Sequence, residues 1–139
     1  MATDPSVLVP VVSQPSLPMA VTGKGRRTID CSAEDLATVA GRCAAGDLAV
    51  IGLRFKGDRL ATAGRFEFLR ERLGDAFIGV ELNDEDGNPD SRLSPHSVLT
   101  EHLIDEPDQP THDALELVLD HFRSKLLGPV DQEKVTDVT

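Results

Sequence analysis

The stretch Asp47–Asp58, DLAVIGLRFKGD, decides the fold that this sequence predicts. Its centre, Leu48–Phe55, is a nearly continuous apolar run, which is typical of a strand buried on both faces of a parallel sheet. The run ends at Lys56-Gly57-Asp58, so a carboxylate follows the carboxyl end of a buried strand. Ligands and catalytic groups gather at that end in open α/β sheets. Asp58 is therefore the first candidate functional residue.

Strands and helices are predicted to alternate along the rest of the chain. Ser32 and Asp35 fit a helix N-terminal capping box, and glycines at 46 and 74 fit helix ends. The predicted elements are a strand at Val7–Val12, a loop at Ser13–Arg27, a helix from Ser32 to Gly46, the buried strand, a helix from Thr62 (as N-cap) to Gly74, a strand at Ala76–Leu82, a polar loop at Asn83–Pro95 and a helix from about Thr111 to Leu127. This order predicts an α/β fold with three mostly parallel strands and right-handed crossovers.

Helical spacing predicts which side chains face the core. Arg65, Arg70 and Arg72 are expected to point mostly outward, and Arg54 to reach solvent or an acidic neighbour from the end of its strand. The predicted inward set is Leu36, Val39, Ala40, Cys43, Phe66, Leu69, Leu73, Leu115, Val118, Leu119, Phe122 and Leu126.

Length and charge narrow the classes of function. The 139 residues predict one domain over residues 1–128, followed by a polar tail at 129–139. A net charge of −10 argues against a nucleic-acid partner and an anionic membrane surface. Much of the acid lies in Asn83–Asp90 and Glu101–Asp108, which are interpreted as solvated loops. Neither a signal peptide nor a membrane span is recognisable, so a cytoplasmic protein is expected.

His96 is the second candidate functional residue. It follows the strand at Ala76–Leu82, and loops after adjacent parallel strands meet at one edge of a sheet, so Asp58 and His96 are expected to lie together. A carboxylate that accepts a hydrogen bond from imidazole fixes the tautomer and stabilises the imidazolium, as in a nucleophile–His–acid triad. The plainer alternative is a Gly-Asp turn and an unrelated loop histidine.

Other chemistry has weaker support in the sequence. Cys31 and Cys43 have neither a metal-binding nor a redox spacing, and Cys43 is predicted to be a core residue. A zinc or iron site is an alternative because imidazole and carboxylate groups lie close in sequence, although their spacing matches no known motif. The residues concerned are His96, His102, Asp105 and His112. No cofactor and no metal are expected.

Several segments together resemble the C-terminal half of dienelactone hydrolase-like α/β-hydrolases. The most specific is Pro95–His102, PHSVLTEH. The other matching segments are Pro10–Pro18 (PVVSQPSLP), Phe55–Leu60 (FKGDRL), Arg65-Phe66 and Leu69, and the similarity extends from about Asp4 to Leu127. By this resemblance Asp58 is the triad acid and His96 the general base of an enzyme that hydrolyses a small ester or lactone without metal or cofactor.

The resemblance also implies a nucleophile, which these residues do not supply. The family's nucleophile, Cys or Ser, lies on a strand-to-helix turn of the Gly-x-[Ser/Cys]-x-Gly kind, upstream of the segment PVVSQPSLP. Ser13, Ser16, Cys31 and Cys43 are not in such a turn. The chain is therefore interpreted as a truncated family member, with a degenerate paralogue as the second explanation, and is expected to be inactive alone.

A non-catalytic role is the main alternative. Three parallel strands form a small sheet whose apolar edge would be left unpaired, and an unpaired edge can add a strand from another chain. The edge of the Val7–Val12 strand is thus a candidate surface for self-association or for pairing with a separately made half-domain.

Overall fold

The computed structural model describes residues 2–15 and 22–127; the predicted polar tail at 129–139 lies outside the described residues. Its elements are β1 (Val11–Ser13), α1 (Gly23–Arg26), α2 (Ala33–Ala44), β2 (Val50–Phe55), α3 (Ala63–Leu73), the short helix η1 (Gly74–Ala76), β3 (Phe77–Leu82), the short helix η2 (Asp84–Asp86) and α4 (Pro110–Leu126).

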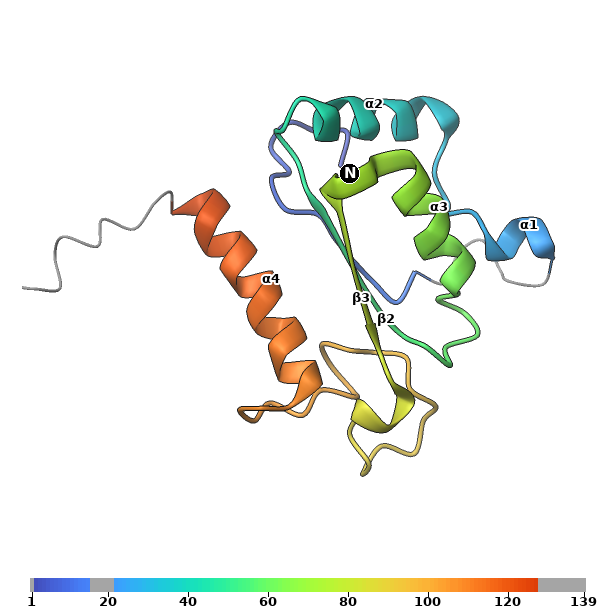
Figure 1. Cartoon of the computed structure of the whole chain (residues 1–139), viewed down its shortest axis with the longest axis vertical. Helices are drawn as coiled ribbons and strands as arrows, with labels where there is room; N and C mark the ends of the chain where they lie inside the picture. Colours follow the sequence, from blue (N-terminus) through green and yellow to red (C-terminus); the bar gives the residue numbers. More distant parts are fainter. Residues whose placement is uncertain (1, 16–21, 128–139) are drawn as a thin grey trace, which may run out of the picture.

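The described strands form one parallel sheet in the order β1-β2-β3. Every residue of the central strand β2 is buried, as the apolar run predicted. In Figure 1 the strands run toward the loop that follows β3, so their carboxyl ends share one edge of the sheet. The prediction of an α/β fold with parallel strands that alternate with helices is confirmed.

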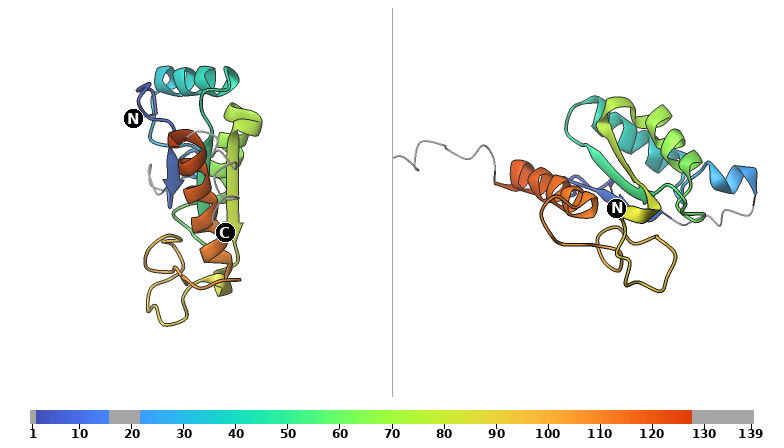
Figure 2. Two further views of the ribbon diagram at one scale, coloured as in Figure 1. Left: turned by 90° about the vertical axis from the view of Figure 1, so that its left-hand side faces the viewer. Right: turned by 60° about the horizontal axis from the view of Figure 1, so that its bottom comes forward.

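Helices cover both faces of this sheet. One core cluster joins β2 and β3 to α2 and α3 through side chains that include Cys43, Val50 and Phe66. The other joins the opposite face of β2 to α4 through side chains that include Ile51 and Val118. Figure 2 shows the resulting three layers, with α4 on one side of the sheet and α2 and α3 on the other.

Capping and glycine signals place the helix ends correctly, with one difference in mechanism. Ser32 Oγ accepts a hydrogen bond from the backbone N–H of Asp35 at 3.0 Å, and Gly46 and Gly74 have the positive φ angles that end α2 and α3. Thr62 is the N-cap of α3, but its hydroxyl donates to the carbonyl of Arg26 instead of capping the helix.

The first strand is shorter than predicted. It covers Val11–Ser13, although the carbonyl of Pro10 just before it also accepts from the N–H of Ile51 in β2. The Arg42 guanidinium donates to the carbonyls of Ala2, Asp4 and Val7 at 2.6–2.9 Å. The predicted loop at Ser13–Arg27 contains α1, which Thr22 caps; residues 16–21 of that loop lie outside the described residues.

Two predictions of side-chain orientation are wrong, those for Arg65 and Leu126. Arg65 is fully buried, and burial lowers the pKa of its guanidinium while the nearby negative charge of Asp58 opposes that change. For Arg54 the second predicted alternative holds: the side chain is buried and pairs with an acidic neighbour, Glu81, at 2.5 Å. Leu126, predicted to face the core, is exposed near the end of α4.

Among the described residues, no helix combines the length and the apolar character needed to cross a bilayer.

Candidate functional site

The turn after β2 fixes the carboxylate of Asp58. The backbone N–H of Asp58 donates to the Phe55 carbonyl, which reverses the chain at the end of the strand. Asp58 Oδ1 then accepts hydrogen bonds from the backbone N–H groups of Leu60 at 2.8 Å and Ala61 at 3.1 Å. The side chain is only 3% exposed, so the carboxylate has little freedom to rotate.

The other oxygen of Asp58 faces His96. His96 Nδ1 lies 2.5 Å from Asp58 Oδ2, so the two residues predicted from sequence are directly hydrogen-bonded. A carboxylate can only accept, so Nδ1 carries the proton and the lone pair of the neutral imidazole lies on Nε2. The His96 side chain is 28% exposed and lines a surface cleft, which leaves the ring accessible from outside.

Side-chain contacts between the loops after β2 and β3 hold this edge of the sheet together. Asp84 Oδ1 accepts from the backbone N–H of Gly57 at 2.8 Å, and Lys56 Nζ donates to Asn83 Oδ1 at 2.8 Å. A Cβ on Gly57 would lie 2.0 Å from Asp84 Oδ2, so a larger residue here would displace the Asp84 carboxylate. Asp84 is exposed, as expected for this acidic loop, and in addition holds the turn at Gly57.

Two exposed leucines form the apolar part of the cleft. Leu60 is 47% and Leu93 65% exposed, and both line the same cleft of about 700 Å³ as Asp58 and His96. Large apolar side chains are normally buried, so their exposure beside an accessible imidazole fits a surface that contacts an organic ligand. This pair could not be predicted from sequence, because single leucines in loops have no periodicity.

The buried imidazole of His102 lies under the loop that carries His96. Its Nδ1 accepts from the backbone N–H of Ser97, and its Nε2–H donates to the carbonyl of Leu93, both at 3.2 Å. His102 is 2% exposed, so it supports this loop from inside the protein.

The residues considered as alternative metal ligands do not converge. His96 pairs with Asp58, whereas His112 Nδ1 pairs with Asp105 Oδ1 at 2.8 Å on the exposed start of α4. Both ring nitrogens of His102 bond to backbone groups. Within residues 2–15 and 22–127 no group of three or more His, Cys, Asp or Glu side chains could hold a metal ion.

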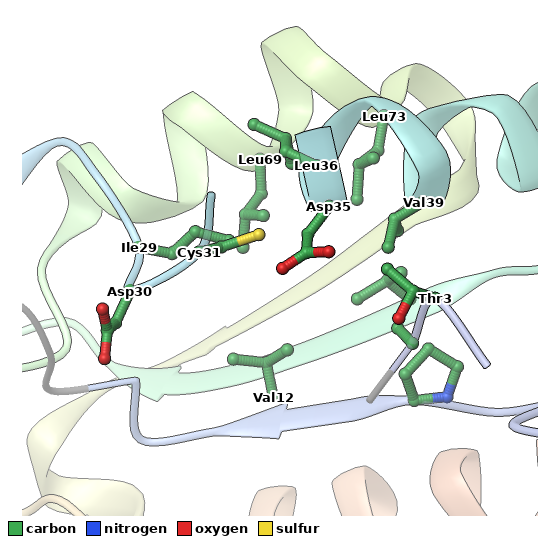
Figure 3. Close-up of a pocket in the computed structure, with 13 residues that line it drawn as sticks. Thr3, Val12, Ile29, Asp30, Cys31, Asp35, Leu36, Val39, Leu69 and Leu73 are labelled. Atoms are coloured by element: carbon green, nitrogen blue, oxygen red, sulfur yellow. The ribbon is translucent and has the colours of Figure 1, made fainter. Parts of the chain in front are cut away.

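A second hollow lies on the opposite side of β1 from α4. It has a volume of about 200 Å³ and lies between α2, α3 and β1, and Cys31 and Asp35 point into it (Figure 3). Burial, together with the negative charge of Asp35, raises the pKa of the Cys31 thiol, which disfavours the reactive thiolate. This hollow shares no lining residue with the His96 cleft, so Cys31 does not contribute a nucleophile there.

Comparison with known proteins gave no relatives: no family model, no curated protein and no solved structure matches this chain.

Proposed function

We propose that this chain provides the acid and the base of a hydrolase that cleaves a small ester or lactone, as in dienelactone hydrolase-like α/β-hydrolases. The observation that supports the proposal best is the 2.5 Å hydrogen bond between Asp58 and His96 at the carboxyl edge of a parallel sheet. In this proposal the sheet is the C-terminal half of an α/β-hydrolase sheet.

The proposed roles follow from the tautomer. His96 Nε2 removes the proton from a Ser hydroxyl or Cys thiol that attacks the substrate carbonyl, and later protonates the leaving oxygen. Asp58 holds the imidazole in place and stabilises the imidazolium that forms. Leu60 and Leu93 provide an apolar wall for the carbon skeleton of the substrate. The nucleophile comes from a polypeptide segment outside these 139 residues.

The proposal is tested with the protein expressed from its native gene with a C-terminal tag, so that any further sequence or partner is retained. We expect this protein to hydrolyse p-nitrophenyl acetate or a small lactone and to react covalently with a fluorophosphonate or an ester-type thiol reagent. Loss of a triad nucleophile costs about 10⁶-fold in turnover, so the 139-residue chain made alone should have negligible activity. If the 139-residue chain alone were as active as the native-gene protein, the proposal that the nucleophile comes from another segment would be contradicted.

A second candidate function is that of a non-catalytic half-domain that pairs with another chain along β1. The specific observation is the direction of the backbone groups in this strand. The N–H of Ile51 donates to Pro10 and the N–H of Gln14 donates to Leu53, so even-numbered residues of the strand face β2. Val11 and Ser13 therefore direct their backbone groups away from β2, where no described strand pairs with them.

Proline substitutions separate the two edges of β1. Val11→Pro removes an outward N–H and should abolish concentration-dependent association in sedimentation velocity, while it leaves the β1–β2 ladder intact. Val12→Pro, the matched control, removes an N–H that faces β2 and should lower the free energy of unfolding. A wild-type chain that stays monomeric at all concentrations and retains no partner from its natural source would exclude this second function.

A further inference from the structure

His102 connects two parts of the cleft that are separated in sequence. It is 2% exposed and packs against the Phe55 ring, with the ring centroids 5.7 Å apart in an edge-to-face arrangement. The residue is therefore anchored on the last residue of β2, the strand that also leads into Asp58.

From this anchor the imidazole bonds to the loop on both sides of His96. Nδ1 accepts from the backbone N–H of Ser97 at 3.2 Å, with the N–H of His96 at 3.5 Å, and Nε2–H donates to the Leu93 carbonyl at 3.2 Å. The backbone N–H of His102 also donates to the carbonyl of Ser97 at 3.0 Å. The short segment that presents Leu93 and His96 is thus held at both ends by one side chain.

We propose that His102 is a positioning residue: its Nδ1, as an acceptor of loop N–H groups, sets the His96 ring against Asp58. An acceptor at Nδ1 together with a donor at Nε2 is the pattern of the neutral imidazole protonated at Nε2. An aliphatic residue of similar size would fill the space but leave the part-buried N–H groups of His96 and Ser97 without this acceptor. The importance of this positioning for catalysis rests on the proposed function, whereas the positioning of the His96 ring by His102 does not depend on it.

Two polar variants separate the contacts of the two ring nitrogens. Asparagine is short and places its amide oxygen near the Nδ1 position, so His102→Asn keeps the acceptor for the loop and loses the bond to Leu93. Glutamine reaches further, so His102→Gln keeps a donor for Leu93 and loses the acceptor for Ser97. His121→Leu on α4 is the control for loss of a histidine, because the hydrogen bond of His121 Nδ1 is to the Leu117 carbonyl of its own helix, away from the His96 loop.

The readout is the solvent-exchange rate of the His96 Nδ1–H proton, measured by NMR on the ¹⁵N-labelled chain. We expect the wild-type protein, His121→Leu and His102→Asn to exchange at similar rates. His102→Gln should exchange roughly tenfold faster, with the backbone amides of Ile51 and Leu53 still protected. Equal rates in His102→Asn and His102→Gln would overturn the proposal, since the Nδ1 contact would then have no role. Failure of the native-gene protein to hydrolyse esters would disprove the proposed function but leave this result unchanged.

Discussion

Asp58 divides its two carboxylate oxygens between folding and the candidate chemistry. Oδ1 accepts the N–H groups of Leu60 and Ala61 and so belongs to the turn, whereas Oδ2 belongs to His96. The turn keeps the carboxylate buried and oriented whether or not the imidazole is present. The two uses can therefore be separated by substitution.

Asp58→Ala should lower the free energy of unfolding by about 1–3 kcal/mol, because two backbone N–H groups lose their acceptor. Asp58→Asn keeps an amide oxygen at the Oδ1 position and should cost less than Asp58→Ala, because both variants lose the charge near Arg65 but only alanine also loses the acceptor of the turn. Urea unfolding of the two variants measures the difference. If both variants lose the same free energy, Oδ1 does not hold the turn.

The pairing of Asp58 with His96 was predictable from sequence because parallel topology brings the loops after neighbouring strands to one edge. The support from His102 was not predictable, since its contacts with Leu93 and Ser97 depend on how an irregular loop folds back. The burial of Arg65 was also missed. Arg65 was predicted to face solvent because charged residues on helices usually do. The nearby negative charge of Asp58 could not be anticipated from the sequence.

At the scale of elements, β2 and β3 are fitted to α3 by a pair of glycines. Gly52 and Gly79 are partners in the sheet register, and the edge-to-face pair of Phe66 and Phe77 lies over them. A Cβ on Gly52 would lie 2.6 Å from Phe77 Cζ and 3.0 Å from Phe66 Cζ. The glycines thus make room for aromatic side chains between the sheet and the helix.

Gly52→Ala should lower the free energy of unfolding by about 1–3 kcal/mol, the usual cost of overpacking a core. Gly41→Ala is the matched control, because Gly41 lies on the exposed side of α2 with nothing within 4 Å of a new Cβ. That change should stabilise the protein by about 0.5–1 kcal/mol through helix propensity. Denaturant unfolding distinguishes the two, and equal effects would refute the packing explanation.

Neighbouring strands are also joined by charge at this interface. Glu81 on β3 binds the buried Arg54 of β2 at 2.5 Å and Arg70 of α3 at 2.9 Å. Burial alone would raise the pKa of Glu81, but the hydrogen bonds and charges of the two arginines outweigh it and lower the pKa below its usual 4.5. Folding therefore favours ionised Glu81.

This lowered pKa predicts a pH dependence with a definite sign. The contribution of Glu81 to stability is complete above its unfolded pKa and is lost as the pH falls through the lower folded value. Glu81→Gln should be less stable than wild type by about 1–3 kcal/mol at neutral pH, and the difference should shrink below about pH 4. The exposed pair Arg27–Glu67 gives the control, since Glu67→Gln should cost less than about 0.5 kcal/mol. A difference that is constant with pH would contradict this account.

Elements with a clear hydrophobic or capping pattern were predicted well. Segments whose backbone groups form hydrogen bonds with distant side chains were predicted less well. The apolar run of β2 and the caps of α2 carry their signals locally. The predicted first strand began too early at Val7, whose carbonyl bonds to the Arg42 side chain of α2 and not to β2. The four-residue helix α1 is too short to show a hydrophobic period.

At the scale of the whole molecule, the candidate site at His96 and the unpaired edge of β1 lie at different places in the described part of the chain. The His96 cleft lies at the carboxyl ends of β2 and β3, and β1 borders the side where no described strand continues the sheet. A nucleophile on a strand next to β1 would approach the same edge of the sheet as Asp58 and His96. The two candidate functions are therefore compatible, and they differ in whether the pairing produces catalysis.

The most direct measurement is kcat/KM for ester or lactone hydrolysis by the protein from its native gene, compared with its His96→Ala and Asp58→Asn variants. We predict a loss of about 10⁶-fold for His96→Ala and about 10⁴-fold for Asp58→Asn, the sizes found when triad bases and acids are removed. Folding of both variants is checked by urea unfolding. A native-gene protein that hydrolyses these substrates equally well with and without Asp58 and His96 would contradict the central claim that they form a catalytic acid–base pair.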